Sequence, residues 1–385
     1  MRIGLAAVDD FDWSQLHHAY GRAVDAPSEL RALLDRNPER RRAAVKYLWS
    51  AILHQGTAWT ATAPAALVVA GLLEDRRLDR DGLDLRGELI SFLESVAAVF
   101  ENSGVSEDEL KEMAAASRRL DELLQEGDDE ALYQDEDASK AFYARSVLDC
   151  VRVTPALAEA VLPHLSNPDP PVRAHAAMAM VTMRRALGPA RAKELVARIE
   201  SMAVAARDPD ERSALVLALG DLGVAPLSFL ADPFPAVRVC AALAPAVSDD
   251  EGATAELLQA LEKHAGEIDG WFHVRPPQFT SNPRFSVVSR VLERVHDFDR
   301  LANAATAVAR ITQKLCVDSD WGPLLAAAFP DGGGRVRTDA QRSYLRALVD
   351  RADLWDRKFG NPIKWFKQAG LPYDRAECAA RLLSR

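Results

Sequence analysis

Apolar residues recur at spacings of three and four along almost the whole chain, and this period is that of one face of an α-helix. Alanine is abundant, which favours helix over strand. No convincing run of alternating β-branched residues is bounded by hairpin turns. The sequence therefore predicts an all-α protein. The helical pattern is illustrated by Arg42–Leu53, Leu85–Phe100, Pro155–Leu165, Val172–Leu187, Ala190–Ala206 and Phe298–Leu315.

Three segments in the middle of the chain share an Asp-Pro pair, then an arginine four to six residues after the aspartate, and then a helix of small residues. An aspartate caps a helix start and a proline fits its first turn. The alanine-rich face lets neighbouring helices approach closely. The three pairs are Asp169 with Arg173, Asp208 with Arg212, and Asp232 with Arg238.

These segments resemble HEAT repeats, in particular the short bacterial HEAT-like type that also occurs in phycobilisome lyases. The resemblance is clear over residues 165–247. It implies an α-solenoid, which is a superhelix of stacked antiparallel helix pairs. It also implies that the three Asp–Arg pairs form a structural ladder of capping and ion-pair contacts between neighbouring repeats.

Three stretches interrupt the helical pattern, and the third, Pro330–Arg335, is expected to be a flexible connector to the C-terminal helices. We predict five parts. They are N-terminal helical repeats (1–100), an acidic helix and loop insertion (101–140), the clear HEAT-like repeats (141–265), an aromatic and proline-rich loop (266–284), and C-terminal helical repeats with a cap (285–385). The terminal repeats of such an array are expected to be atypical caps.

Charge is concentrated in one place. The formal net charge is −10, and residues 101–140, here named the acidic segment, contain fourteen acidic and four basic residues. Residues 335–385 contain twelve basic and six acidic residues. Because nucleic-acid binding depends on positive charge, the overall negative charge disfavours it, and only the C-terminal region would attract a polyanion.

The acidic segment permits two interpretations. Ser106 and Glu109 form a capping-box signature for a helix that stops at Gly127, and acidic residues follow it in what we expect to be a loop. In the first interpretation, the segment is a solvated insertion. In the second, it is a functional element that contacts a basic partner or mimics nucleic acid. The residues assigned to partner binding are Asp128, Asp129, Glu130, Asp135, Glu136 and Asp137.

Residues 266–284, here named the aromatic loop, form the second interruption. A long irregular loop that carries aromatic side chains is unusual within a helical array, and such loops are often binding elements. Alternatively, its rings fill a gap between helices. The residues assigned to partner binding are Trp271, His273, Arg275 and Phe279.

No cofactor or metal site is predicted. The four cysteines, Cys150, Cys240, Cys316 and Cys378, include no C-x-x-C pair and stand among small apolar residues. The chain lacks H-E-x-x-H, G-x-S-x-G and G-x-G-x-x-G motifs. No nucleophile, base and orienting group can be assembled from sequence spacing, so we assign no catalytic residue.

We therefore predict a non-enzymatic solenoid that binds another protein along its concave face, as a scaffold, an adaptor or a toxin-neutralising immunity-type protein. A basic partner would suit the acidic segment. One alternative is a nucleic-acid-binding HEAT-like protein, such as a DNA glycosylase, with Asp320, Trp321 and Trp355 near the basic C-terminal region. A second alternative is a lyase-type enzyme, by analogy of fold alone.

A cytoplasmic location is predicted, with no membrane contact. The beginning of the chain has no apolar region typical of a signal peptide. The longest apolar stretch, Ala61–Leu73, contains a proline and is shorter than the roughly 18 residues that a membrane span requires.

Overall fold

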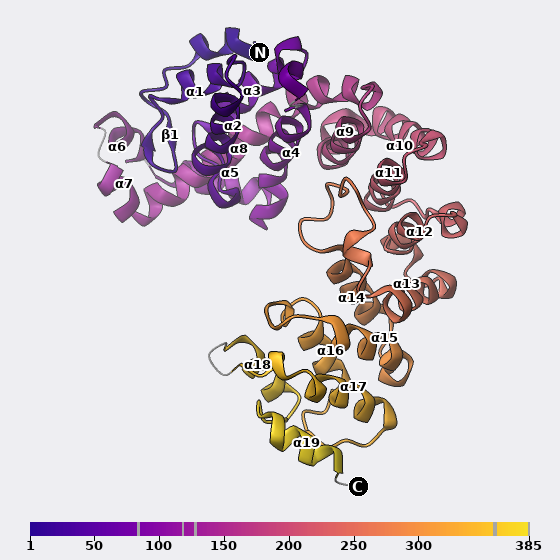
Figure 1. Ribbon diagram of the computed structural model, residues 1–385. Coiled ribbons are helices and arrows are strands. Elements are labelled where there is room, and N and C mark those ends of the chain that lie inside the picture. Colours follow the sequence, from indigo (N-terminus) through magenta and orange to yellow (C-terminus); the bar gives the residue numbers. More distant parts are fainter. Residues whose placement is uncertain (83–84, 118, 127–128, 357–359, 384–385) are drawn as a thin grey trace. The chain divides into compact units, whose positions relative to one another are not determined.

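The computed structural model describes residues 1–82, 85–117, 119–126, 129–356 and 360–383. Helices account for 73% of the structure, and strand in the described part is limited to one short pair, so the all-α prediction is confirmed. The chain divides into two compact units, unit 1 (Met1–Arg198) and unit 2 (Ile199–Arg385) (Figure 1).

Unit 1 begins with a 3₁₀ helix, η1 (Gly4–Asp10), and an antiparallel hairpin of β1 (His17–His18) and β2 (Gly21–Arg22). Its α-helices are α1 (Ala26–Ala32), α2 (Pro38–Tyr47), α3 (Thr62–Leu72), α4 (Arg86–Ser103), α5 (Glu107–Ala116), α6 (Leu120–Glu126), α7 (Asp129–Gln134), α8 (Glu136–Val161) and α9 (Pro170–Thr182). Helix α10 (Gly188–Ala205) continues the chain into unit 2.

Local capping explains several of these helix starts. The Asn37 side chain accepts a hydrogen bond from the backbone N–H of Glu39 at the start of α2. The predicted capping box of Ser106 and Glu109 begins α5. Asp135 caps α8 by accepting from a backbone N–H three residues later. Each cap satisfies a backbone donor that the first turn of a helix leaves free.

Helix α3 forms the centre of unit 1. It corresponds to the longest apolar stretch of the sequence, and it packs against α4, α8 and η1. A helix that is apolar on all sides must be surrounded by protein. Gly71 permits the contact with η1, because a Cβ atom there would lie 2.1 Å from the backbone nitrogen of Gly4. Within the described residues, no helix combines the length and apolar character needed to span a bilayer.

The acidic segment is more helical than its charge suggests. Helices α5, α6 and α7 pack against α8, and apolar residues of α6 and α7 form a buried cluster with it. The predicted single helix is split, since α5 ends at Ala116 and α6 begins at Leu120. Residues 129–134, expected in a loop, form α7. The cluster consists of Leu120, Leu123, Leu132, Ala138, Ala141 and Phe142, so α6 and α7 both contribute to it.

Unit 2 contains two rows of helices, and α11 (Pro209–Asp221) and α12 (Pro235–Ala242) precede them in the chain. The rows consist of α13 (Glu251–His264), α14 (Pro283–Arg294), α15 (Phe298–Ile311), α16 (Trp321–Ala328), α17 (Asp339–Asp350), α18 (Asn361–Gln368) and α19 (Arg375–Leu383). Helices α13, α15, α17 and α19 pack one against the next, and so do α14, α16 and α18. Further contacts join the two rows, such as those between α13 and α14.

Aromatic rings close the C-terminal end of unit 2. The Trp355 ring stacks on Tyr373 at a centroid distance of 5.6 Å, and both rings contact the buried Phe366. The indole N–H of Trp355 donates to the carbonyl of Leu348. Because their rings and polar atoms contact other parts of the unit, these residues complete the core of this end.

Candidate functional site

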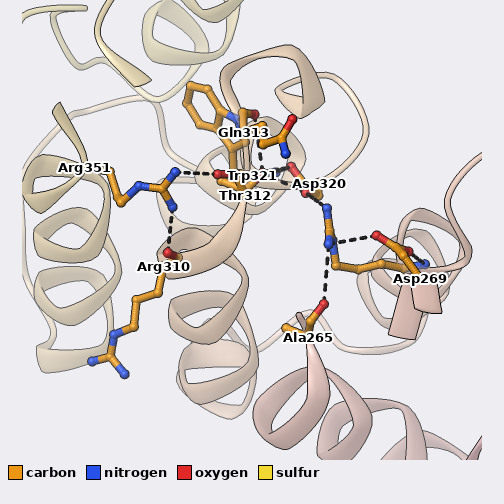
Figure 2. A network of polar contacts seen from close by, with 9 residues as sticks. Ala265, Asp269, Arg310, Thr312, Gln313, Asp320, Trp321 and Arg351 are labelled. Atoms are coloured by element: carbon orange, nitrogen blue, oxygen red, sulfur yellow. Dashed lines mark hydrogen bonds and ion pairs between the residues drawn. The ribbon is translucent and has the colours of Figure 1, made fainter. Parts of the chain in front are cut away.

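A network of buried charges ties together the two ends of the aromatic loop. Asp269 lies near the start of this loop and Arg284 at its end, and their side chains form an ion pair at 2.9 Å (Figure 2). The backbone N–H of Arg284 also donates to Asp269. The guanidinium lies 3.3 Å from the fully buried carboxylate of Asp320. These contacts therefore hold the two ends of the loop close to each other.

Asp320 is the centre of this network. Its carboxylate accepts hydrogen bonds from the Thr312 hydroxyl and from the backbone N–H of Trp321. Burial raises the pKa of Asp320 to about 6, and the hydrogen bonds and Arg284 oppose that increase. Arg351 extends the network by donating to the carbonyls of Arg310 and Thr312 (Figure 2).

The middle of the aromatic loop is fastened to α11. The carboxylate of Asp210, which is only 7% exposed, accepts from the backbone N–H of Val274 at 2.7 Å. The side-chain amide of Gln278 donates to the carbonyl of Ala214 at 3.0 Å. Phe279 is buried and its ring contacts that of Phe272. These contacts hold an irregular stretch of backbone in one path.

The tip of this loop, defined as residues 273–275, is exposed. His273, Val274 and Arg275 all face solvent, and Val274 is 47% exposed. Trp271 is half-buried against His264. Three of the four residues predicted for binding therefore lie at or beside the tip, whereas Phe279 lies beneath it.

A groove of about 370 Å³ lies next to the aromatic loop in unit 2. Phe279 and Gln278 form its wall on the loop side, and α11, α12 and α14 form the rest. Asp221, Arg290 and Glu293 add charge to its lining. This groove brings together side chains that lie far apart in the sequence, and sequence spacing gave no indication of it.

The predicted acidic residues are largely occupied by contacts within unit 1. Asp129 lies 2.7 Å from the imidazole Nε2 of His17 and 3.9 Å from Arg22. Glu130 accepts from Gln134 and Glu136 pairs with Lys140. Asp135 caps α8, Asp137 is exposed, and Asp128 lies outside the described residues.

His17 links the N-terminal hairpin to the acidic segment. Its side chain is fully buried, and burial is the main cause that lowers its pKa, against the opposing effect of Asp129. The Arg22 guanidinium donates to the carbonyl of Leu124 at 2.8 Å. Thus part of the negative charge that suggested a free binding surface instead fastens the hairpin to α6 and α7.

The arginines of the predicted ladder bind backbone carbonyls just before their own helices. Arg212 also forms an ion pair with Asp232 at 2.8 Å, and Arg238 forms one with Glu256 at 2.8 Å. The carbonyl acceptors are Asn167 and Pro168 for Arg173, Ala206 for Arg212, and Asp232 and Pro233 for Arg238.

The aspartates of the ladder differ from one another. The Asp208 side chain accepts from the backbone N–H of Asp210, and that of Asp232 from Phe234. Asp169 makes no capping hydrogen bond through its side chain. The shared Asp-Pro motif therefore does not give the three carboxylates the same role.

A second hollow in unit 2 is lined by arginines. It has a volume of about 390 Å³ and lies between α15 and α17. Arg310 and Arg346 are exposed there, and their guanidiniums form no ion pair or hydrogen bond within the described residues. The neighbouring Arg342 donates to the carbonyl of Leu382, and two aspartates also line the hollow.

Asp320 and Trp321, on which the alternative of a nucleic-acid enzyme depends, lie in the core. Trp321 is 1% exposed and Asp320 is fully buried. The buried thiols of Cys150 and Cys240 have pKa values raised by burial, as expected for inert packing residues. No group of three metal-binding side chains occurs in the part of the chain that the structure describes.

Comparison with protein-family models, with curated proteins and with solved structures finds no match to this chain.

Proposed function

We propose that the chain is a non-enzymatic protein-binding module with a HEAT-like solenoid architecture, which acts as a scaffold, an adaptor or an immunity-type protein. The two rows of helices in unit 2 and the Arg212–Asp232 ion pair support this architecture. The observation that carries the proposal is the aromatic loop, whose tip is exposed while its ends and middle are fastened.

A fixed, exposed loop is suited to recognition because less conformational entropy is lost when it binds. His273 and Arg275 offer hydrogen-bond donors at the tip, and Val274 offers apolar surface between them. The adjacent groove would accept a side chain of the partner. In the acidic segment, internal contacts leave Asp137 exposed, and the strong excess of acidic residues would attract a basic partner.

The proposal is tested with three substitutions at the tip, His273→Ala, Val274→Ser and Arg275→Ala, made together. A partner is first isolated by affinity purification from cells that naturally make the chain, and its binding is then measured with both proteins purified. We expect the substitutions to weaken binding by at least about tenfold. Leu315→Ser, at another exposed apolar residue of unit 2, is the matched control.

Two results would contradict the proposal: the absence of any stoichiometric partner, or equal affinity of the tip variant and the native chain. Electrostatic attraction by the acidic segment makes a separate prediction. Binding should weaken as salt rises above about 0.1 M, because added ions screen exposed charges.

The arginine-lined hollow favours nucleic-acid binding as a second candidate function. Arg310 and Arg346 carry exposed guanidiniums of the kind that bind phosphate. Affinity for a DNA duplex that falls steeply with salt, and that is lost on Arg310→Ala with Arg346→Ala, would support this function. Arg300→Ala removes an exposed arginine outside the hollow and serves as the control. Lack of duplex binding at low salt would exclude this candidate.

A further inference from the structure

A hollow of about 770 Å³ in unit 1 has features of a ligand site. It lies where the segment around η4 (Arg76–Gly82) meets the start of α4 and the turn before α9. The turn contains the 3₁₀ helix η5 (Leu162–Ser166). We name this hollow the η5 pocket. Six ionisable residues line it: Glu74, Arg76, Asp79, Arg86, His164 and Asp169.

The first observation that points to a ligand is the environment of His164. Its side chain is only 5% exposed, and its Nε2 atom is buried without a hydrogen bond within the described residues. The nearest carboxylate oxygen, Oε1 of Glu74, lies 3.4 Å away. The Asn167 amide is 3.5 Å from Nδ1, which is longer than an ordinary hydrogen bond and leaves the tautomer open. A buried nitrogen that makes no hydrogen bond is costly, so a hydrogen bond to a ligand atom would stabilise it.

Asp169 is the second, independent sign. The corresponding aspartates, Asp208 and Asp232, both accept a hydrogen bond from the first turn of their helices. Asp169 does not, and its carboxylate lines the η5 pocket. Asn167 instead accepts from the backbone N–H of Asp169. The same motif thus leaves one carboxylate available, and that one faces the hollow.

The charges around the η5 pocket indicate the kind of ligand. The buried Arg86 is already bonded to the carbonyls of Leu73 and Asp75 and paired with Asp79. Burial lowers the pKa of His164, which favours the neutral imidazole. The remaining charges are the carboxylates of Glu74 and Asp169 and the exposed guanidinium of Arg76, which together carry a net charge of −1.

We propose that the η5 pocket binds a ligand with a cationic nitrogen, either an ammonium or a guanidinium group. Glu74 and Asp169 supply the opposite charge, and Nε2 of His164 accepts a hydrogen bond from the ligand in the tautomer that leaves this nitrogen unprotonated. The exposed position of Arg76 permits it to move away from the cation or to bind an anionic group of the same ligand. This inference concerns unit 1 alone and does not depend on partner binding.

The test is titration of the full chain with agmatine, a small dication that has no carboxylate. We expect binding with a dissociation constant of about 1 mM, together with a change in the imidazole NMR signals of His164. Combining Glu74→Gln with Asp169→Asn should weaken binding by about tenfold or more. The matched control is Glu88→Gln, which removes an exposed carboxylate from nearby α4 without altering the pocket lining.

Three outcomes would overturn the proposal. One is no agmatine binding up to about 20 mM. Another is an equal loss of affinity in the control variant, which would indicate general attraction to negative charge. The third is binding of succinate in preference to agmatine, which would identify an anion site at Arg76. All three substituted residues have exposed or half-exposed side chains, and circular dichroism verifies that the variants fold.

Discussion

The acidic segment of unit 1 and the aromatic loop of unit 2 both interrupt a series of helices, but different forces hold them. The acidic segment is ordered by a buried apolar cluster, and many of its carboxylates bond to nearby side chains. The aromatic loop is irregular, and a buried ion pair fixes its ends while two hydrogen bonds fix its middle. Charged side chains therefore stabilise the fold in both regions. In the loop, the contacts of Val274 and Arg275 hold the tip in place and leave its side chains exposed.

The comparison shows why residue composition is a poor guide to which surface is free. A segment rich in acidic residues is expected to remain solvated. Here leucines spaced among those residues supply enough apolar surface to form helices against α8. Conversely, the loop contains residues of core type, yet Val274 is exposed because its backbone is held by Asp210.

The largest effect is expected from Arg284→Ala. This change removes the charge that faces both Asp269 and the buried Asp320, and we expect it to lower the free energy of unfolding by about 3–5 kcal/mol. Arg300→Ala breaks an exposed ion pair with Glu251 and should cost about 1 kcal/mol or less. Chemical denaturation compares the two, and similar losses would contradict the role of the buried network.

The apolar cluster of the acidic segment is tested by Leu132→Ala. We expect a loss of about 3 kcal/mol, because the leucine is 1% exposed and its removal leaves a cavity. Amide hydrogen exchange should become faster in α6 and α7. Gln134→Ala, at an exposed residue of α7, should change stability by less than about 0.5 kcal/mol. Unchanged exchange in the leucine variant would mean that the cluster does not order the segment.

The two regions should respond to pH in opposite directions. Because burial raises the pKa of Asp320 to about 6, its contribution to stability is fully present below the unfolded value near 4 and is lost as pH rises through 6. We compare the free energy of unfolding of the native chain with that of Asp320→Asn. The excess of the native chain should therefore fall by about 2 kcal/mol between about pH 4 and about pH 7.5. If the difference in free energy of unfolding between the two proteins stays constant with pH, the pKa of Asp320 is not raised.

For the exposed Glu136, the bond to Lys140 lowers its pKa. The stability gained from this pair is therefore present above the unfolded pKa and lost as pH falls through the folded value. The difference in free energy of unfolding between the native chain and Glu136→Gln should accordingly increase with pH. This increase should be small, because the ion pair is exposed to solvent.

A smaller effect is expected where the loop is fastened to α11. Asp210→Ala removes the acceptor for the backbone N–H of Val274, so we expect a loss of about 1–2 kcal/mol and faster amide exchange at the tip. Asp210→Asn keeps an oxygen acceptor, so this variant should lose less stability than Asp210→Ala. If both variants exchange at the tip as slowly as the native chain, the hydrogen bond does not hold the loop.

Much of the secondary structure follows from local signals in the sequence. The capping box at Ser106 and Glu109 begins α5 as predicted, and the pattern over 298–315 corresponds closely to α15. These features depend on residues within one or two turns of each other, which a single sequence contains. In contrast, α8 continues through Pro155, where a helix start was predicted, because packing along its length outweighs the missing N–H group.

The candidate site could be predicted only in part, because its supports come from distant residues. Trp271, His273 and Arg275 were identified from the loop itself, and two of them lie at the exposed tip. The supports, Asp210 and Asp320, lie 64 and 36 residues away from their loop partners. Their sequence contexts are an ordinary helix start and an ordinary turn, so no local pattern distinguishes them.

Site-specific photo-crosslinking at Val274, carried out in cells that naturally make the chain, is the most direct test of the proposed recognition by the loop tip. We expect one discrete product that contains a second protein, and no such product when the crosslinker replaces the exposed Leu315. We also expect the product to be lost when the crosslinker at 274 is combined with Arg275→Ala. No product at 274, or the same products at both positions, would contradict recognition of a partner by the loop tip.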